Sequence, residues 1–335
     1  MDTSPVRNPL SPAKVVSFLA GLAILYLLFS QIDFQDLSRL LLAIKPWYLL
    51  SGGILYLIKA SVRAYRTMQL NQDSRLKLIR VLRLTLASSL ISQVLPFKLG
   101  ELSYVYLLKK ESRLPTAQGI SSLALLRIFD VLAVALLFLA IATGEGLPGR
   151  LAAYYVPLLL FIAGILLFLG IWMLISRRAG FALAGKNRNA MIFSLPIVAK
   201  LIHSMEQVAT SLKQYKPARV PGFVLWACLE WLVNFAVFHA ILVGMGFSPT
   251  FFVTVVSVSF SILASVLPIN SLGNFGTQEA GWATGMILMG FSRVDAIASG
   301  FATHLITLGY FLLLGGFSWT SYWFESRTGT KVTNE

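Results

Sequence analysis

The feature that most constrains this chain is a series of apolar runs, each a candidate to cross a lipid bilayer as a helix. A transmembrane helix needs roughly 20 apolar residues. The candidate spans are residues 15–30, 47–66, 118–141, 151–175, 221–243 and 296–323. Of the 335 residues, 56% are hydrophobic and 13% are charged, which leaves too few polar side chains to cover a soluble fold of this size. We therefore expect one integral membrane domain, residues 1–335, that is entirely α-helical.

Two further apolar segments, 84–108 and 250–290, differ from the six spans because Pro and Gly interrupt each of them near its middle. Both residue types disfavour a continuous helix. The predicted breaks fall at Pro96, Gly100, Pro268, Gly273 and Gly276. The pattern predicts a polytopic all-α membrane protein with about six full transmembrane helices and two broken helical hairpins.

Clusters of basic residues between the apolar runs set the orientation of the chain in the cell membrane. Three such clusters follow residues 47–66, 84–108 and 151–175, and the positive-inside rule places all three in the cytoplasm. Because basic clusters flank the first broken segment on both sides, we expect it to be re-entrant from the cytoplasmic face. The second broken segment then enters from the opposite face, and both chain termini are cytoplasmic.

The two broken segments also resemble each other in sequence. Residues 92–101 and 264–279 share a Leu-Pro pair that is followed by Gly and then Glu. Similar segments that enter from opposite faces form an inverted-topology repeat, by which secondary transporters build a site near the bilayer midplane. The predicted regions are a first repeat at 10–175, a cytoplasmic connector with an amphipathic helix at 176–220, and a second repeat at 221–325.

Ionisable residues at the breaks are the first candidates for substrate binding. The half-helix after each break presents free N–H groups and a positive dipole end, which suit an anionic group, and Lys98 adds a positive charge beside the first. Glu101 and Glu279 begin these half-helices, where an acidic residue either caps the helix or contacts substrate. Their recurrence in both segments favours a functional role. Arg127 can hold a phosphate with its guanidinium group or bridge to either glutamate.

Other charged residues lie inside the candidate spans. Asp130 follows Arg127 by three residues, so simple neutralisation of the arginine and a functional role are equally supported. Lys59, Arg63 and Arg66 share a helical face near the cytoplasmic end of their span. For Arg66 we favour snorkelling to the headgroups, whereas Lys59 lies deeper and could guide a lipid phosphate inward.

Glu230 and Asn234 are four residues apart and face one way. They either line a polar cavity or hydrogen-bond between helices, and the second reading is slightly favoured. His239 and His304 are isolated in the sequence, and we expect each to hydrogen-bond between helices instead of binding a metal. With one cysteine, Cys228, the chain offers no paired-thiol site. We predict no metal site and no cofactor.

The formal charge of +14 and the pI near 10.0 raise the question of nucleic acid. The basic residues, however, lie in short clusters between apolar runs, where they set topology and meet anionic headgroups. We therefore expect no nucleic-acid partner. The expected partners are membrane lipids, with a separate lipid-synthesising enzyme as a further candidate, and the sequence leaves the oligomeric state open.

From about residue 10 to residue 325, the sequence resembles the flippase-like family represented by the transmembrane region of lysylphosphatidylglycerol synthases. The resemblance rests on residues 95–101 and 126–130 and on the second break, with Pro268, Gly273, Gly276 and Glu279. It implies translocation of a lipid between leaflets, such as an aminoacylated phospholipid or a polyprenyl-linked sugar.

The sequence thus favours a lipid flippase or transporter, without catalytic residues, in which a polar headgroup enters a cavity between the two hairpins. An intramembrane lipid-modifying enzyme is the main alternative, although the sequence has no Gly-x-Ser-x-Gly elbow and no His-Glu-x-x-His pair. A non-catalytic subunit of a lipid synthase is the third candidate.

Overall fold

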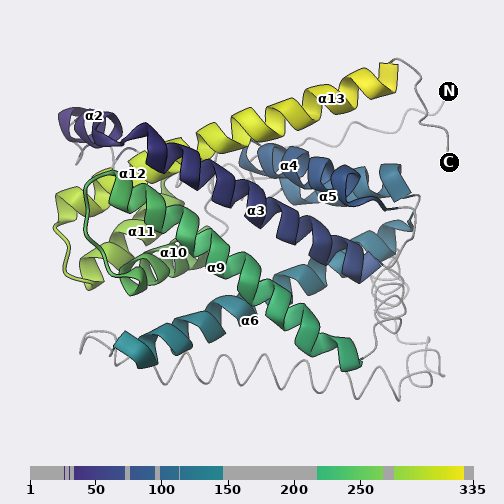
Figure 1. Cartoon of the computed structure of the whole chain (residues 1–335), viewed down its shortest axis with the longest axis horizontal. Helices are drawn as coiled ribbons and strands as arrows, with labels where there is room; N and C mark the ends of the chain where they lie inside the picture. Colours follow the sequence, from purple (N-terminus) through teal and green to yellow (C-terminus); the bar gives the residue numbers. More distant parts are fainter. Residues whose placement is uncertain are drawn as a thin grey trace, which may run out of the picture. The chain divides into compact units, whose positions relative to one another are not determined.

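The computed structural model describes residues 34–71, 76–94, 99–112, 114–145, 217–266 and 275–327, together with Tyr26 and Ser30. Every regular element within these residues is a helix (Figure 1). The all-α fold class is therefore confirmed for the described part of the chain.

The helices follow one another in two groups along the sequence. The first group is α2 (Phe34–Ala43), α3 (Pro46–Asn71), α4 (Leu78–Val94), α5 (Leu99–Ser112) and α6 (Thr116–Glu145). The second group is the short 3₁₀-helix η2 (Pro217–Arg219), α9 (Val220–Gly244), α10 (Phe251–Val266), α11 (Thr277–Leu288), α12 (Arg293–Tyr310), the π-helical turn η4 (Phe311–Gly315) and α13 (Gly316–Arg327).

Three helical stretches of the described residues are long and apolar enough to cross a membrane: Gln118–Thr143, Val220–Gly244 and Arg293–Ser321. They coincide with the predicted spans 118–141, 221–243 and 296–323, and the last of them passes through the π-helical turn η4. A fourth candidate is the pair α2 and α3, which meets the same test only when the two helices are taken together. The predicted spans 15–30 and 151–175 lie outside the described residues, apart from Tyr26 and Ser30.

The helices α2 and α3 meet at an angle of 80°. Pro46 is the first residue of α3, a position that proline favours because its fixed φ suits a helix and its missing N–H would have had no helical partner. The same ring disfavours the helical conformation of the preceding residue, Lys45. The sharp bend is therefore encoded locally by the Lys45–Pro46 pair.

The chain forms two compact units, each assembled from segments that are distant in the sequence. Unit 1 comprises Met1–Gly52, Ser89–Glu101 and Val237–Leu313, and unit 2 comprises Gly53–Ser88, Leu102–Ala236 and Leu314–Glu335. Each unit contains its own group of buried ionisable residues, and the two groups are described separately below.

Within unit 1, α10 and α11 form a tightly packed antiparallel hairpin (Figure 1). A Cβ atom at Gly281 would lie 2.7 Å from the Cα of Ser261, and one at Gly285 would lie 2.6 Å from the Cα of Ser257. The partner numbers fall as the glycine numbers rise, so the two helices run in opposite directions. Gly281 and Gly285 are four residues apart, the spacing of small residues that allows two helices to approach closely.

The second predicted break lies between α10, which ends at Val266, and α11, which begins at Thr277. The first lies between α4, which ends at Val94, and α5, which begins at Leu99. The prediction that Gly100 is part of this break is wrong, because Gly100 lies in the first turn of α5. Pro96, Lys98, Pro268 and Gly273 are outside the described residues, as is most of the connector at 176–220. The division of the chain into two repeats stays a prediction.

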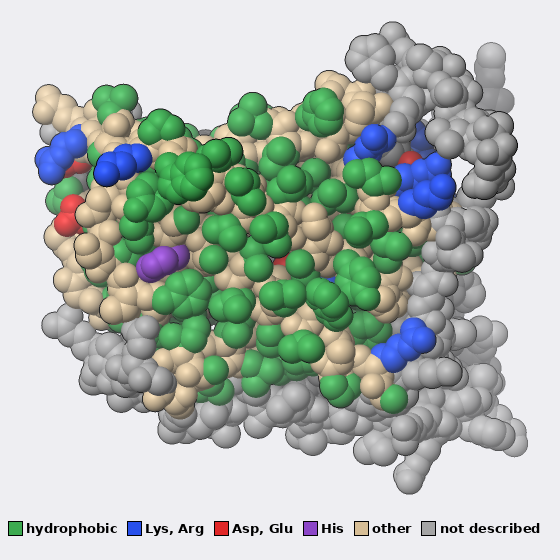
Figure 2. Space-filling model, viewed as in Figure 1, with side chains coloured by type: hydrophobic (Ala, Val, Ile, Leu, Met, Phe, Trp, Pro, Cys, Tyr) green, Lys and Arg blue, Asp and Glu red, His purple; other side chains and the backbone are tan. Residues whose placement is uncertain are grey.

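Hydrophobic side chains predominate on the described surface drawn in Figure 2. Helix α9 illustrates the pattern, because Leu225, Leu229 and Leu232 form an exposed stripe along one side. On another side of the same helix, Glu230 and Asn234 are buried. This is the reverse of a soluble surface helix, and it suits a helix whose outer face contacts lipid.

Candidate functional site

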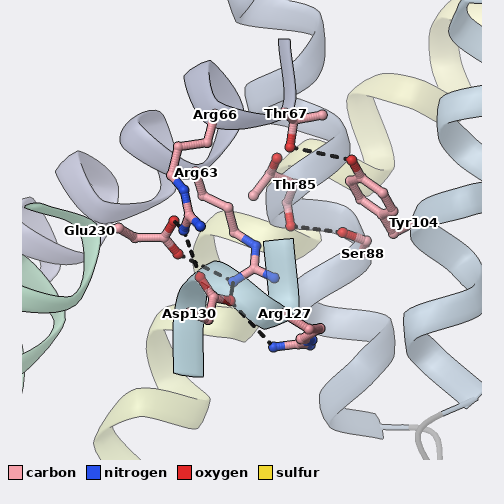
Figure 3. A network of polar contacts seen from close by, with 9 residues as sticks. All are labelled: Arg63, Arg66, Thr67, Thr85, Ser88, Tyr104, Arg127, Asp130 and Glu230. Carbon is pink, nitrogen blue, oxygen red and sulfur yellow. Dashed lines mark hydrogen bonds and ion pairs between the residues drawn. The ribbon is translucent and has the colours of Figure 1, made fainter. Parts of the chain in front are cut away.

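Four charged residues of unit 2 meet where three helices pack together, and we call them the charge cluster (Figure 3). Arg63 and Arg66 are one helical turn apart on α3, Asp130 comes from the middle of α6, and Glu230 comes from α9. Side chains three residues apart in a helix project from the same face. Both arginines can therefore reach the carboxylates of the two neighbouring helices.

Arg66 is the centre of the charge cluster. Its Nη1 atom donates to Oδ1 of Asp130 at 2.7 Å and also to Oε2 of Glu230. Nη1 of Arg63 donates to Oε1 of Glu230 at 3.2 Å and lies 3.9 Å from Oδ2 of Asp130. Hydrogen bonds between ionised partners are among the strongest in proteins, so these contacts tie α3, α6 and α9 together.

The predicted snorkelling of Arg66 is wrong. Its side chain is 3% exposed, and those of Asp130 and Glu230 are 4% and 2% exposed. A charge buried among apolar helices is costly unless an opposite charge accompanies it, and two carboxylates accompany this one. Arg66 therefore pairs inside the protein instead of extending toward the headgroups.

Arg127 stands at the more open side of the charge cluster. Its side chain is 45% exposed, and its Nη1 atom lies 3.8 Å from Oδ2 of Asp130. Neutralisation of Arg127 by Asp130, one of the two alternatives for this pair, would rest on the longer contact of Asp130, because Arg66 holds the other oxygen of the same carboxylate at 2.7 Å. Arg63 is intermediate, with a side chain that is 20% exposed.

Lys59 and Asn234 lie near the charge cluster on α3 and α9. The Nζ atom of Lys59 is 5.4 Å from the centre of the Tyr56 ring, and the ammonium group is within electrostatic range of Glu230 and Asp130. Asn234 is buried one turn after Glu230. The structure therefore brings five of the predicted site residues into one region of unit 2, and Arg66 and Asp130 join them there. The five are Lys59, Arg63, Arg127, Glu230 and Asn234.

Two buried atoms of the charge cluster have no hydrogen-bond partner among the described residues. They are Nη2 of Arg66 and Oδ2 of Asp130. The Nη1 atoms of Arg63 and Arg127 lie 3.9 Å and 3.8 Å from Oδ2, which is too far for a hydrogen bond. Leaving a buried polar atom without a partner is costly. The charge cluster thus retains a guanidinium N–H group with capacity to bind an acceptor.

A second polar group lies in unit 1, where Glu279 of α11 and His304 of α12 are both buried. Nδ1 of His304 contacts Oε1 of Glu279, and Nε2 of the same ring lies 3.0 Å from Nε2 of Gln93. The ring of Phe275 stacks on His304 with centroids 4.2 Å apart. The hydrogen bonding predicted for His304 is present, and His239 likewise bonds to Thr254 of α10 at 3.0 Å.

Glu279 also caps its own helix. Its Oε2 atom accepts from the backbone N–H of Gly276 at 2.7 Å, and Gly276 has a φ angle of +94°, which glycine adopts without strain.

Sequence reasoning missed Gln93, although it is a polar residue close to the Leu-Pro pair of the first broken segment. Glu101 and Gly100 lie in the first turn of α5, but the side chain of Glu101 is outside the described part.

No group of three His, Cys, Asp or Glu residues that could hold a metal ion occurs among the described residues. The charge cluster pairs carboxylates with guanidinium groups, and hydrogen bonds from Arg63 and Arg66 engage three of the four oxygen atoms of Asp130 and Glu230. What the arrangement offers is a set of N–H donors beside buried carboxylates.

Apolar helices of spanning length, with buried charges between them, define this chain as a multi-pass α-helical membrane protein. The family model of the lysylphosphatidylglycerol synthase TM region matches residues 14–316. The chain belongs to this family, which confirms the resemblance noted at the two broken segments. A search of curated proteins gave no match.

Proposed function

We propose that this protein is a flippase or transporter that moves a polar-headed lipid between the leaflets of the cell membrane. It would do so without chemical change to the lipid and with both termini in the cytoplasm. The family supports a role in membrane lipid biology. The choice of transport over catalysis rests on the charged residues described above.

The observation that carries this proposal is the burial of three ionisable side chains, those of Arg66, Asp130 and Glu230, between helices of an apolar protein, with the half-buried Arg63 beside them. Intramembrane ionisable residues are rare and costly, and they usually mark the path of a substrate or ion. A purely structural role would be served as well by apolar packing, since a buried ion pair often contributes little net stability. The charge cluster therefore favours a site that handles a polar headgroup.

The three arginines in and beside the charge cluster would have different tasks. Arg66 is the anchor, because it is buried and bonds to both carboxylates. Arg63 is more exposed and its contact with Asp130 is long, at 3.9 Å. A headgroup phosphate could therefore bind other N–H groups of Arg63 while Nη1 keeps its hydrogen bond to Glu230. Arg127, which is still more exposed, would meet the headgroup first.

The paired broken segments supply the second part of the proposed mechanism. We interpret α4–α5 and α10–α11 as re-entrant hairpins of an inverted-topology repeat. Helix α10 has 16 residues and α11 has 12, and at about 1.5 Å per residue neither spans a hydrocarbon core of about 30 Å. Rocking of such repeats would expose a headgroup site to each side in turn.

The proposal can be tested in vesicles reconstituted with the purified protein. Dithionite reduction of a trace of acyl-labelled NBD-phosphatidylglycerol reports how fast the lipid moves from the inner to the outer leaflet. We expect Arg63→Gln to slow translocation roughly tenfold or more, since a hydrogen bond to a charged group contributes about 1.5–3 kcal/mol. Lys109→Gln is the matched control, because Lys109 is exposed in the last turn of α5.

Wild-type vesicles that translocate the probe no faster than protein-free vesicles would contradict the proposal, and so would equal rates for Arg63→Gln and Lys109→Gln. Mass spectrometry of the lipids recovered from the same vesicles separates transport from catalysis. A covalently altered lipid would identify an enzyme instead.

A further inference from the structure

We infer that the charge cluster selects a headgroup with net negative charge, a phosphate without a compensating ammonium group. This inference rests on the proposed function, because it names the class of lipid that the same residues would handle. It departs from what the family name suggests, since a lysylated phospholipid carries a net positive headgroup.

The first argument is the balance of charge. Around the two carboxylates of Asp130 and Glu230, the described residues place Arg63 and Arg66 in ion pairs and Arg127 at 3.8 Å. The ammonium group of Lys59 is also within electrostatic range. In the described part of this region, basic groups therefore outnumber acidic groups by four to two. An added anion reduces this imbalance in a region of low dielectric, and an added cation increases it.

The second argument is the accessibility of each charge. The carboxylates of Asp130 and Glu230 are 4% and 2% exposed, and both accept hydrogen bonds from Arg66. The one carboxylate oxygen without a hydrogen bond, Oδ2 of Asp130, lies 3.9 Å from Nη1 of Arg63 and 3.8 Å from Nη1 of Arg127, so a lipid ammonium group would have to approach it between two positive charges. The side chain of Arg127, in contrast, is 45% exposed. A headgroup that approaches the charge cluster thus meets positive charge before negative charge.

The third argument is an unused donor. Nη2 of Arg66 is buried and has no hydrogen-bond partner among the described residues. A guanidinium group binds phosphate oxygens through parallel N–H donors. An ammonium group has no lone pair and cannot accept these hydrogen bonds. A phosphate oxygen that reached Nη2 would satisfy this atom while the Nη1 bonds to Asp130 and Glu230 stay intact.

The phosphate could belong to a glycerophospholipid or to a polyprenyl phosphate, because both present the same anionic oxygens. Binding is therefore tested separately from transport, by native mass spectrometry of the purified full-length protein in detergent. Equal mole fractions of phosphatidylglycerol and lysylphosphatidylglycerol are the decisive pair, since they share the phosphodiester and differ in the aminoacyl group. Parallel samples contain phosphatidylethanolamine or undecaprenyl phosphate.

We expect phosphatidylglycerol adducts to exceed lysylphosphatidylglycerol adducts roughly tenfold, because like charges brought together at a binding site are strongly unfavourable. Lys59→Gln should reduce this ratio by removing one positive charge near the site. Lys109→Gln, at an exposed position, should leave it unchanged. Comparison with the undecaprenyl phosphate sample shows whether the protein binds a polyprenyl phosphate or a glycerophospholipid more tightly.

Equal binding of the two phospholipids, preference for the lysylated lipid, or no binding of any phosphate lipid would each overturn the inference. A different result addresses the proposed function alone. If phosphatidylglycerol binds preferentially but is not translocated in vesicles, the site is anionic-lipid-selective and the flippase proposal fails.

Discussion

The hairpin of α10 and α11 can be tested by adding one methyl group where the two helices touch. In a Gly281→Ala variant, the new Cβ atom would lie 2.7 Å from both Cβ of Ala264 and Cα of Ser261, and it would also clash with the carbonyl oxygen of Phe260. Atoms this close cannot be accommodated by a side-chain rotation, because two of the three belong to the backbone of α10.

The expected cost follows from this geometry. Overpacking a tight interface destabilises proteins by about 1–3 kcal/mol. We expect Gly281→Ala to fall toward the upper end of that range, because the whole of α10 must shift. Gly309→Ala is the matched control in the same unit. A Cβ atom there has no neighbour within 4 Å, and replacing a helical glycine by alanine stabilises a helix by about 0.5–1 kcal/mol.

Both variants can be compared by thermal unfolding in detergent, followed by circular dichroism. One kcal/mol shifts Tm by about 2–4 °C in chains of 150–250 residues. We therefore expect Gly281→Ala to melt several degrees below the wild type, and Gly309→Ala to melt at or slightly above it. If the two variants had the same Tm, the close antiparallel packing of α10 and α11 would be refuted.

Two further predictions concern the buried polar groups. Gly276→Ala should lower stability by about 1–2 kcal/mol, since φ is +94° at this position and a Cβ atom disfavours positive φ; an unchanged Tm in the same assay would contradict this backbone conformation. Arg66→Met should destabilise by about 3–5 kcal/mol, because it removes the closest positive partner of two buried carboxylates. Asp130→Leu should destabilise by less, because Arg66 keeps its contact with Glu230. The double variant should cost clearly less than the sum, whereas additive losses in a double-mutant cycle would show that the two residues are not coupled.

The transmembrane helices could be predicted from the sequence because the signal for them is local. A run of apolar residues long enough to span the bilayer can satisfy its backbone only as a helix, and the spans at 118–141, 221–243 and 296–323 were predicted within a few residues. The helix break before Pro46 has an equally local cause. The four-residue spacing of Gly281 and Gly285 is likewise a local signal for the close contact that these residues make with α10.

The pairing of charges could not be predicted, because it depends on which helices pack together. Arg66 contacts Asp130 and Glu230 across 64 and 164 residues of sequence. The predicted span ended at Arg66, which suggested a residue at the membrane surface. Helix α3 in fact continues to Asn71, so Arg66 lies within the helix and faces its neighbours. The sequence did offer one signal for a buried basic partner, namely the two acidic residues Asp130 and Glu230 inside apolar spans.

The sequence left capping and function as alternatives for Glu279, and the contacts show that its two oxygen atoms differ. One accepts from the backbone of Gly276, and the other contacts Nδ1 of His304. Nε2 of His304 in turn lies 3.0 Å from Nε2 of Gln93. The contacts of the carboxylate therefore tie the start of α11 to α12. A headgroup that used Glu279 would have to displace one of these contacts, whereas the charge cluster of unit 2 has a donor with no partner among the described residues. Headgroup binding is therefore better supported at Arg66 and its neighbours, and Glu279 is better placed to fix the start of α11.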